Sequence, residues 1–256
     1  MRTVTRTIST SVPSRMTMSK PAFGKSAEEF VRNLGAEENS SCSEGFGCRI
    51  TALIPQGGEK VTVRVLVSNP SGREDVEFLV LTVHAESLEL SVGEVEEEML
   101  PELEYYAEVA RAYGSACASF AFAPSSYAAL SKKLLQKGFS KGVCSDAIAC
   151  LRRTGFVKED EIALRRAQIF VEKRWGSTRI LAKLREEGFD TDACRPVKEY
   201  LDGVDFPEIC KELIAKRFGS VPSDRHEREL LCASLLRMGH SAADIRRAMA
   251  ELSQNR

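Results

Sequence analysis

The sequence predicts a mainly α-helical protein, in which three tandem three-helix repeats form an elongated curved stack behind a small antiparallel β-rich N-terminal segment. Strand-like alternation is confined to about residues 48–90, and helical periodicity runs from about residue 102 to the end. Within that helical part, one helix–glycine–helix pattern occurs three times. The domains that these patterns predict are 1–46, 47–101, 102–157, 158–204 and 205–256.

The N-terminal extension, residues 1–46, is rich in Ser, Thr and Arg and has no hydrophobic periodicity. Such a composition buries too little apolar surface to offset the entropy of ordering, so the sequence predicts disorder there. Its first 27 residues contain no acidic side chain, a property that organellar transit peptides share. We favour the alternative that the extension is dispensable.

The β-rich segment contains three β-branched runs separated by turn residues. The runs are CRITALI (48–54), KVTVRVLVS (60–68) and VEFLVLTVH (76–84). QGGE (56–59) and NPSGRED (69–75) lie between them and favour turns, so a small antiparallel sheet is expected. After Gly93 the segment 94–113 is expected to be helical, with Pro101 as a break or as its first residue.

The three repeats align without a gap on Gly138, Gly188 and Gly239, which are 50 and 51 residues apart. Leucine or isoleucine stands eight and four residues before each glycine, which gives one apolar face to a helix. Glycine supplies the left-handed residue that ends that helix, and Ser or Asp two residues later is suited to cap the next one. These capping residues are Ser140, Asp190 and Ser241.

A further helix is expected before each of these pairs, at about 102–122, 159–174 and 206–217. The first is expected to end near Pro124, the second at Gly176 and the third at Gly219.

Several of these segments together resemble the RecX family, the regulatory proteins of the RecA recombinase. The resemblance covers about residues 48–253, and two departures from the family pattern are Ala123 and Ala129. The segments that carry it are SVGEVEEEML (91–100), SYAALSKKLLQKGFS (126–140), GFVKEDE (155–161), KRWGSTRILAKLREEGF (173–189) and LLRMGHSAADIRRAM (235–249).

The scattered cysteines favour a reduced, cytoplasmic compartment, and no apolar run approaches the roughly 18 residues needed to span a bilayer. The resemblance implies a non-enzymatic protein without a cofactor, and we expect a monomer. It would bind the RecA–DNA filament along its helical groove and limit filament growth. Strand exchange, ATP hydrolysis, co-protease activity and the SOS response would be damped. Whether single- or double-stranded DNA in the filament is contacted directly stays open.

Basic side chains are the candidate contacts to that partner. Residues 1–119 hold 11 basic and 18 acidic residues, a balance of −7, whereas residues 120–256 hold 25 and 19, a balance of +6. Adjacent basic pairs on a helix flank its buried face, so they are expected to face solvent and to be available to phosphates or acids. Plain solvation is the alternative. The candidates are Lys132, Lys133, Lys137, Arg152, Arg153, Arg165, Arg166, Lys173, Arg174, Arg179, Lys183, Arg185, Arg246 and Arg247.

The remaining motifs favour structural roles. Trp175, the single tryptophan, stands at a helix end and is expected to pack at a corner instead of stacking on a base. His240 shares its repeat column with Phe139 and Phe189, so it is expected to be a packing or surface residue. The eight cysteines are scattered and show no metal-ligand spacing, so we expect reduced thiols that pack as small hydrophobes.

Catalytic chemistry is not indicated. The sequence contains no phosphate-binding loop and no Ser/His/Asp or Cys/His pattern, and the acids are not expected to have apolar surroundings. One rival hypothesis is a direct DNA-binding module of helix-turn-helix type, with recognition helices at 141–153, 191–202 and 242–252. Residues 190–202 carry four acids against two basic residues, which disfavours it. A helical scaffold for another partner is the third hypothesis.

Overall fold

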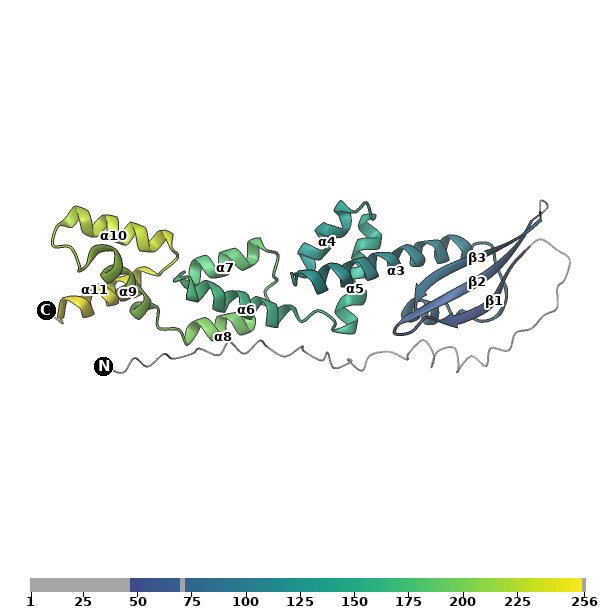
Figure 1. Ribbon diagram of the computed structural model, residues 1–256, viewed down its shortest axis with the longest axis horizontal. Coiled ribbons are helices and arrows are strands. Elements are labelled where there is room, and N and C mark those ends of the chain that lie inside the picture. The colour runs from purple at the N-terminus through teal and green to yellow at the C-terminus, as the bar shows by residue number, and fades with distance from the viewer. Residues whose placement is uncertain (1–46, 70–71, 255–256) are drawn as a thin grey trace, which may run out of the picture.

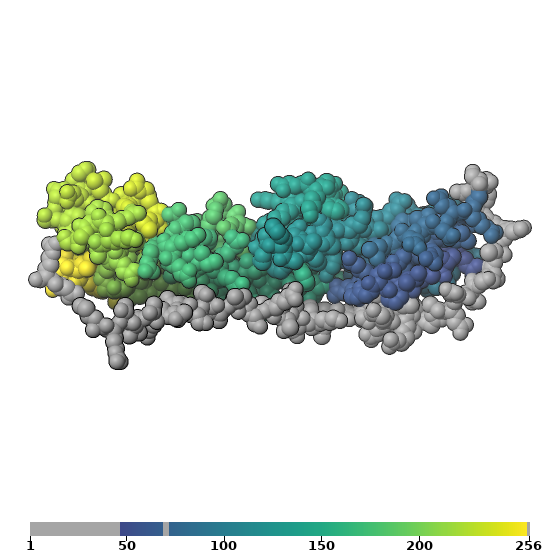
Figure 2. All heavy atoms as spheres, in the orientation of Figure 1, coloured from purple at the N-terminus to yellow at the C-terminus, as the bar shows by residue number. Residues whose placement is uncertain are grey.

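The computed structural model describes residues 47–69 and 72–254, so the disorder predicted for 1–46 lies outside the described residues. The chain is elongated, with the sheet at one end and helices α9 to α11 at the other (Figure 1). Drawn with all atoms, it forms one continuous elongated body (Figure 2).

The strands are β1 (Gly47–Pro55), β2 (Lys60–Asn69), β3 (Gly72–Leu81) and β4 (Gly93–Val95). The helices are α2 (Thr82–Ser87), α3 (Met99–Phe122), α4 (Tyr127–Gln136), α5 (Lys141–Thr154), α6 (Glu159–Glu172), α7 (Ser177–Glu186), α8 (Arg195–Asp202), α9 (Phe206–Phe218), α10 (Arg225–Arg237) and α11 (Ala242–Gln254).

The predicted antiparallel sheet is confirmed, with the strand order β3-β2-β1-β4. Alternate residues of β2 point to one face, and Val61, Val63 and Val65 are fully buried there. They pack in one core with Leu90 and with Leu103 from the start of α3. The sheet therefore has one face anchored on the helical part of the protein.

Two expectations for this segment are wrong. The third strand does not reach His84 but ends at Leu81, and the chain turns into α2 at Thr82, whose main-chain N–H makes the last hydrogen bond to the neighbouring strand segment, at the Glu59 oxygen. His84 then packs on the ring of Tyr106, with ring centroids 4.3 Å apart. The strand propensity of these residues is thus overridden by tertiary contacts.

The stretch from Glu94 also starts differently from the expectation. Its first two residues belong to β4, which pairs with β1, and α3 begins only at Met99. Pro101 does not break α3, because it lies in the first turn, where a missing N–H removes no helical hydrogen bond. Helix α3 then runs for 24 residues and joins the sheet to α4 and α5.

The glycine corners have the predicted conformation. The φ angles are +93° at Gly138, +87° at Gly188 and +90° at Gly239, in the region where a side chain is strained. Ser140 caps α5 by accepting the Val143 N–H at 3.3 Å. These local features follow from the residue types alone.

The first helix of the second triplet ends differently from the prediction. Helix α6 ends at Glu172, and Arg174, not Gly176, takes a left-handed φ of +62°. Gly176 instead has φ −79° and is the N-cap of α7. In the third triplet Gly219 does end α9, as predicted, with φ +71°.

Asp190 also has a role different from the expected one. Its side chain accepts the Ala193 N–H at 2.9 Å, but α8 begins only at Arg195, so Asp190 caps a turn and not the helix. Pro196 stands in the first turn of α8, where proline is compatible with a helix start. The following triplet behaves as predicted, because Ser241 Oγ accepts the Asp244 N–H at 3.0 Å and Asp244 accepts from the Ser241 N–H.

The helical part has two main cores. One gathers residues of α3, α4 and α5, and the other runs without interruption from α6 to α11. Cys144 and Cys194 are buried in these cores, as the repeat columns predicted. Among the described residues, no helix is both long and apolar enough to cross a membrane.

Candidate partner-binding surface

Helices α4, α7 and α10, which we call the middle-helix row, lie along one long edge of the molecule (Figure 1). Each is the second helix of one of the three predicted three-helix units, for which we keep the word triplet, and all three run toward the end that carries the sheet (Figure 1). The contacts between successive members of this row explain how the triplets are joined.

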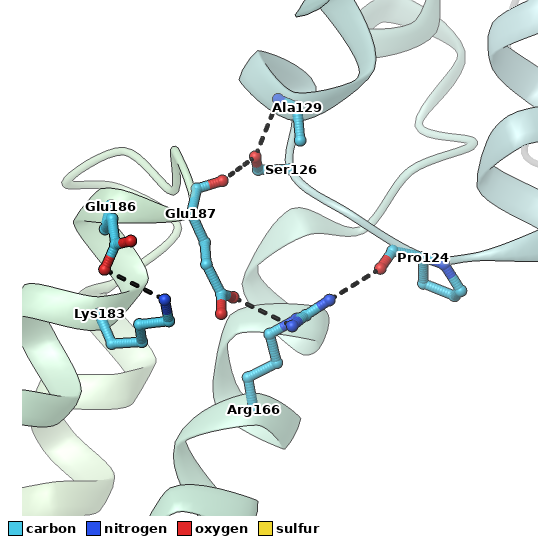
Figure 3. Close-up of polar contacts among 7 residues, drawn as sticks. All are labelled: Pro124, Ser126, Ala129, Arg166, Lys183, Glu186 and Glu187. Atoms are coloured by element: carbon cyan, nitrogen blue, oxygen red, sulfur yellow. Dashed lines mark hydrogen bonds and ion pairs between the residues drawn. The ribbon is translucent and has the colours of Figure 1, made fainter. Parts of the chain in front are cut away.

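The first joint places the end of α7 against the start of α4 (Figure 3). Ser126, the N-cap of α4, accepts the Ala129 N–H at 3.1 Å and donates its hydroxyl to the Glu187 main-chain oxygen at 2.6 Å. A Cβ on Gly188 would lie 2.7 Å from the Cβ of Ala128, which is closer than real side chains approach. The joint therefore requires a glycine both for its backbone and for its contact.

The second joint repeats this relation between α10 and α7. The Gly176 N–H donates to the Met238 oxygen at 2.9 Å, and the Thr178 N–H donates to the Gly239 oxygen at 3.2 Å. A Cβ on Gly239 would lie 2.3 Å from the Cβ of Arg179. In both joints the carbonyls at a helix C-terminus meet donors at the N-terminus of the preceding middle helix, so the helix dipoles are aligned head to tail.

Three of the fourteen candidate basic residues bridge neighbouring triplets. Arg166 pairs with Glu187 at 3.1 Å and donates to the Pro124 oxygen at 3.3 Å (Figure 3). Arg174 pairs with Glu212 of α9 at 2.8 Å. These side chains do face solvent, as expected, but each also forms an ion pair within the chain.

The third bridge is Arg152 of α5. Its guanidinium lies 4.4 Å from the centroid of the Tyr127 ring and 3.6 Å from the Asp190 carboxylate. It therefore links α5 to the start of α4 and to the loop before α8.

Trp175 packs at a corner, as predicted. Its ring is stacked on Phe170 with a centroid distance of 4.7 Å, and the Arg179 guanidinium lies 3.9 Å from its centroid on a cation–π contact. The Lys173 ammonium lies 5.9 Å from the Phe170 ring. Two of the candidate cations thus belong to one stack with the aromatic pair.

The other candidates divide into engaged and unengaged side chains. Lys183 pairs with Glu186, Arg247 pairs with Glu251, and Lys137 donates to Ser115 and Ser119 of α3 at 2.6 and 3.3 Å. Within the described ranges 47–69 and 72–254, six candidates form no ion pair, no side-chain hydrogen bond and no contact with an aromatic ring, and α4 carries two of them and no acid. The six are Lys132, Lys133, Arg153, Arg165, Arg185 and Arg246.

One acid lies in surroundings that the sequence did not suggest. Glu159, at the start of α6, is 7% exposed, and its carboxylate accepts the Tyr127 N–H at 2.8 Å. Burial raises the pKa of this carboxyl. The expectation that no acid has apolar surroundings is therefore wrong, and Glu159 satisfies a donor at the N-terminus of α4.

Two histidines are buried where parts of the chain meet. His240 is 2% exposed, its Nε2 lies 3.1 Å from the Arg174 oxygen, and burial lowers its pKa. His84 Nε2 lies 3.6 Å from Cys150 Sγ, and burial lowers the pKa of His84 as well. His240 therefore has the packing role that its repeat column predicted.

The thiols and acids of the described residues offer no metal-binding group of three or more ligands. Burial raises the pKa of the Cys144 and Cys194 thiols, and it raises that of Cys210 to about 12. Thiols with a raised pKa are poor nucleophiles and poor ligands at neutral pH.

The fold and the middle-helix row define an elongated helical protein with a small leader sheet. No family model matches the chain, and no curated protein matches its sequence. Two solved structures are similar in fold. One is the crystal structure of regulatory protein RecX, with a TM-score of 0.58 and 15% identity over 78% of this chain and 98% of that chain. The other is RecX from Lactobacillus salivarius, with a TM-score of 0.50 and 18% identity over 57% of this chain and 97% of that chain. The resemblance to RecX is thus confirmed, and what the two structures establish is a shared fold.

Proposed function

We propose that this protein is a RecX-type regulator that binds the RecA–DNA filament and inhibits the recombinase, ATPase and co-protease activities of RecA. It would act in the cytoplasm as a monomer, without catalysis of its own, in DNA repair, homologous recombination and the SOS response. The observation that carries the proposal is the fold shared with regulatory protein RecX over 98% of that chain.

The proposed units are three tandem three-helix repeats at 102–157, 158–204 and 205–256, which form an elongated curved stack behind the β-rich segment of 47–101. Two observations support equivalence of the units. The corner glycines share one conformation. In addition, Ser126 and Gly176, which each stand twelve residues before the corner glycine of their own unit, contact the residue before the corner glycine of the next unit, Glu187 and Met238 respectively. An array of equal units suits a partner that is itself repetitive, such as a helical filament.

The contact surface would be the exposed edge of the middle-helix row, mainly at α4, the member of the row nearest the sheet. Lys132 and Lys133 are the candidates that stand on α4 without an ion pair in the described part of the chain. Cations in this setting attract phosphates or acidic side chains, and they do so mainly by increasing the rate of encounter. Arg152, Arg166 and Arg174 would act indirectly, by holding the triplets in register.

The test measures ATP hydrolysis and strand exchange by RecA on single-stranded DNA with and without this protein. We expect inhibition by the wild type and weaker inhibition by the double variant Lys132→Glu, Lys133→Glu. The matched control is Lys198→Glu, Lys216→Glu, which makes the same charge change at exposed sites on α8 and α9. All three proteins should melt at similar temperatures, because exposed substitutions change stability by only about 0.5 kcal/mol.

Equal inhibition by the two double variants would show that α4 is not the contact surface. Absence of any effect on RecA, together with tight binding to duplex DNA, would refute the proposed function and favour a direct DNA-binding module.

A further inference from the structure

The middle-helix row ends at a corner, Lys137–Gly138, against which no described helix N-terminus is placed. A Cβ built on Gly138 would meet nothing within 4 Å among the described atoms. The main-chain oxygens of Lys137 and Gly138 accept no main-chain hydrogen bond from the described residues. At the other two corners, the Met238 and Gly239 oxygens accept main-chain N–H groups of Gly176 and Thr178, the Glu187 oxygen accepts the Ser126 hydroxyl, and the Gly188 oxygen accepts no main-chain hydrogen bond from the described residues.

Contacts within the chain hold the Lys137–Gly138 corner in place. The Lys137 ammonium donates to the hydroxyls of Ser115 and Ser119, which ties the corner to α3. Ser140 caps α5 on the other side of the glycine. A site that is ordered in advance loses less entropy when a partner binds.

The opposite end of the row differs. At the start of α10, the Asp224 carboxylate accepts the main-chain N–H of Glu227 at 2.9 Å, so the Glu227 N–H already has an acceptor inside the chain. Glu227 stands twelve residues before its corner glycine, where the other triplets have Ser126 and Gly176. A second copy of this chain would therefore bring a bulky acid and an occupied donor to the corner, so the occupant is a helix of another protein.

We propose that the Lys137–Gly138 corner binds the N-terminus of a helix from a recombinase subunit of the filament. The two internal joints define its chemistry, namely an N-cap of Ser or Gly followed two residues later by a small side chain such as Ala128 or Thr178. The donors of that helix meet the free carbonyls, and its dipole continues the row. The identity of the partner rests on the proposed function.

The test compares Gly138→Asn with Gly155→Asn. Both glycines have a left-handed φ, +93° and +60°, and a Cβ meets nothing within 4 Å at either. Asn is the side chain that best tolerates a left-handed backbone, and the φ of Gly155 lies within the usual left-handed range of about +50 to +70°, whereas that of Gly138 lies outside it, so the affinities are compared at equal concentrations of folded protein. Only at Gly138 would the new side chain occupy the space that a docked helix needs.

Binding of labelled protein to RecA filaments on single-stranded DNA is measured by sedimentation or anisotropy. We expect Gly138→Asn to weaken binding by about tenfold or more, which corresponds to about 1.4 kcal/mol, and Gly155→Asn to match the wild type. Equal affinities of the two variants overturn the docking site but not the proposed function. Absence of wild-type binding overturns both.

A second measurement does not depend on the stability of either variant. A photo-crosslinking residue is placed at Gln136, exposed beside the corner, and at exposed Lys198 on α8 as the control. Cross-linking to the first residues of a recombinase helix from Gln136, and not from Lys198, supports the proposal. The same cross-links from both positions overturn it.

Discussion

Replacing Gly239 by alanine tests whether the joint between α7 and α10 stabilises the helical stack. The new Cβ would lie 2.3 Å from the Arg179 Cβ and 2.6 Å from the Arg179 nitrogen. Carbon atoms in contact are about 3.5–4.0 Å apart, so the corner must move away by more than an ångström. That displacement breaks both hydrogen bonds of the joint, from Gly176 to Met238 and from Thr178 to Gly239.

The magnitude follows from these contacts. Two main-chain hydrogen bonds contribute about 1 kcal/mol each, and the left-handed backbone costs alanine about 1 kcal/mol more. Gly155→Ala is the matched control, because its φ of +60° imposes the same kind of strain while its Cβ meets nothing within 4 Å. The Gly239 variant should therefore be less stable than the Gly155 variant by about 2 kcal/mol.

Urea unfolding gives the difference in the free energy of unfolding, and hydrogen exchange of the Gly176 and Thr178 amides locates it. Exchange is the more specific measurement, because stacked helical units need not unfold in one step. The Gly239 variant should expose both amides, whereas the Gly155 variant should not. A difference under about 0.5 kcal/mol with unchanged protection of these amides would refute the role of the joint.

Two further predictions concern the same region. Burial lowers the pKa of His240 below its unfolded value of about 6.5, so the unfolded chain binds a proton first and the wild type loses stability as pH falls below about 7. His84 shifts in the same direction, so His240→Phe should reduce this loss in urea unfolding without abolishing it, and an unchanged pH dependence would count against the assignment. Because Phe170 and Arg179 lie on the Trp175 ring, single-stranded DNA alone should leave its fluorescence unchanged, whereas Arg179→Met should increase quenching by acrylamide. Quenching of the wild type by DNA would indicate base stacking instead.

The corners of the helices were predictable from the sequence because their chemistry is local. Gly138, Gly188 and Gly239 end helices wherever a left-handed residue is needed, and Ser140 and Ser241 cap the helices that follow within a few residues. The resemblance to RecX rests on the same series of corners. Local rules failed at Leu81, where the strand ends early and His84 packs on distant Tyr106, and at Asp190, which caps a turn instead of α8.

Only the tertiary structure distinguished the basic residues from one another. Arg166 and Lys132 both stand on amphipathic helices, yet Arg166 joins two triplets and Lys132 has no ion pair among the described residues. The partners of Arg166 lie 21 and 42 residues away along the chain, so no local pattern signals them. The sequence by itself determined the helices and their corners, because hydrogen bonding within a few residues controls both. The packing of distant helices on one another decided which of the basic side chains form ion pairs within the chain, because ion pairs depend on distances in space.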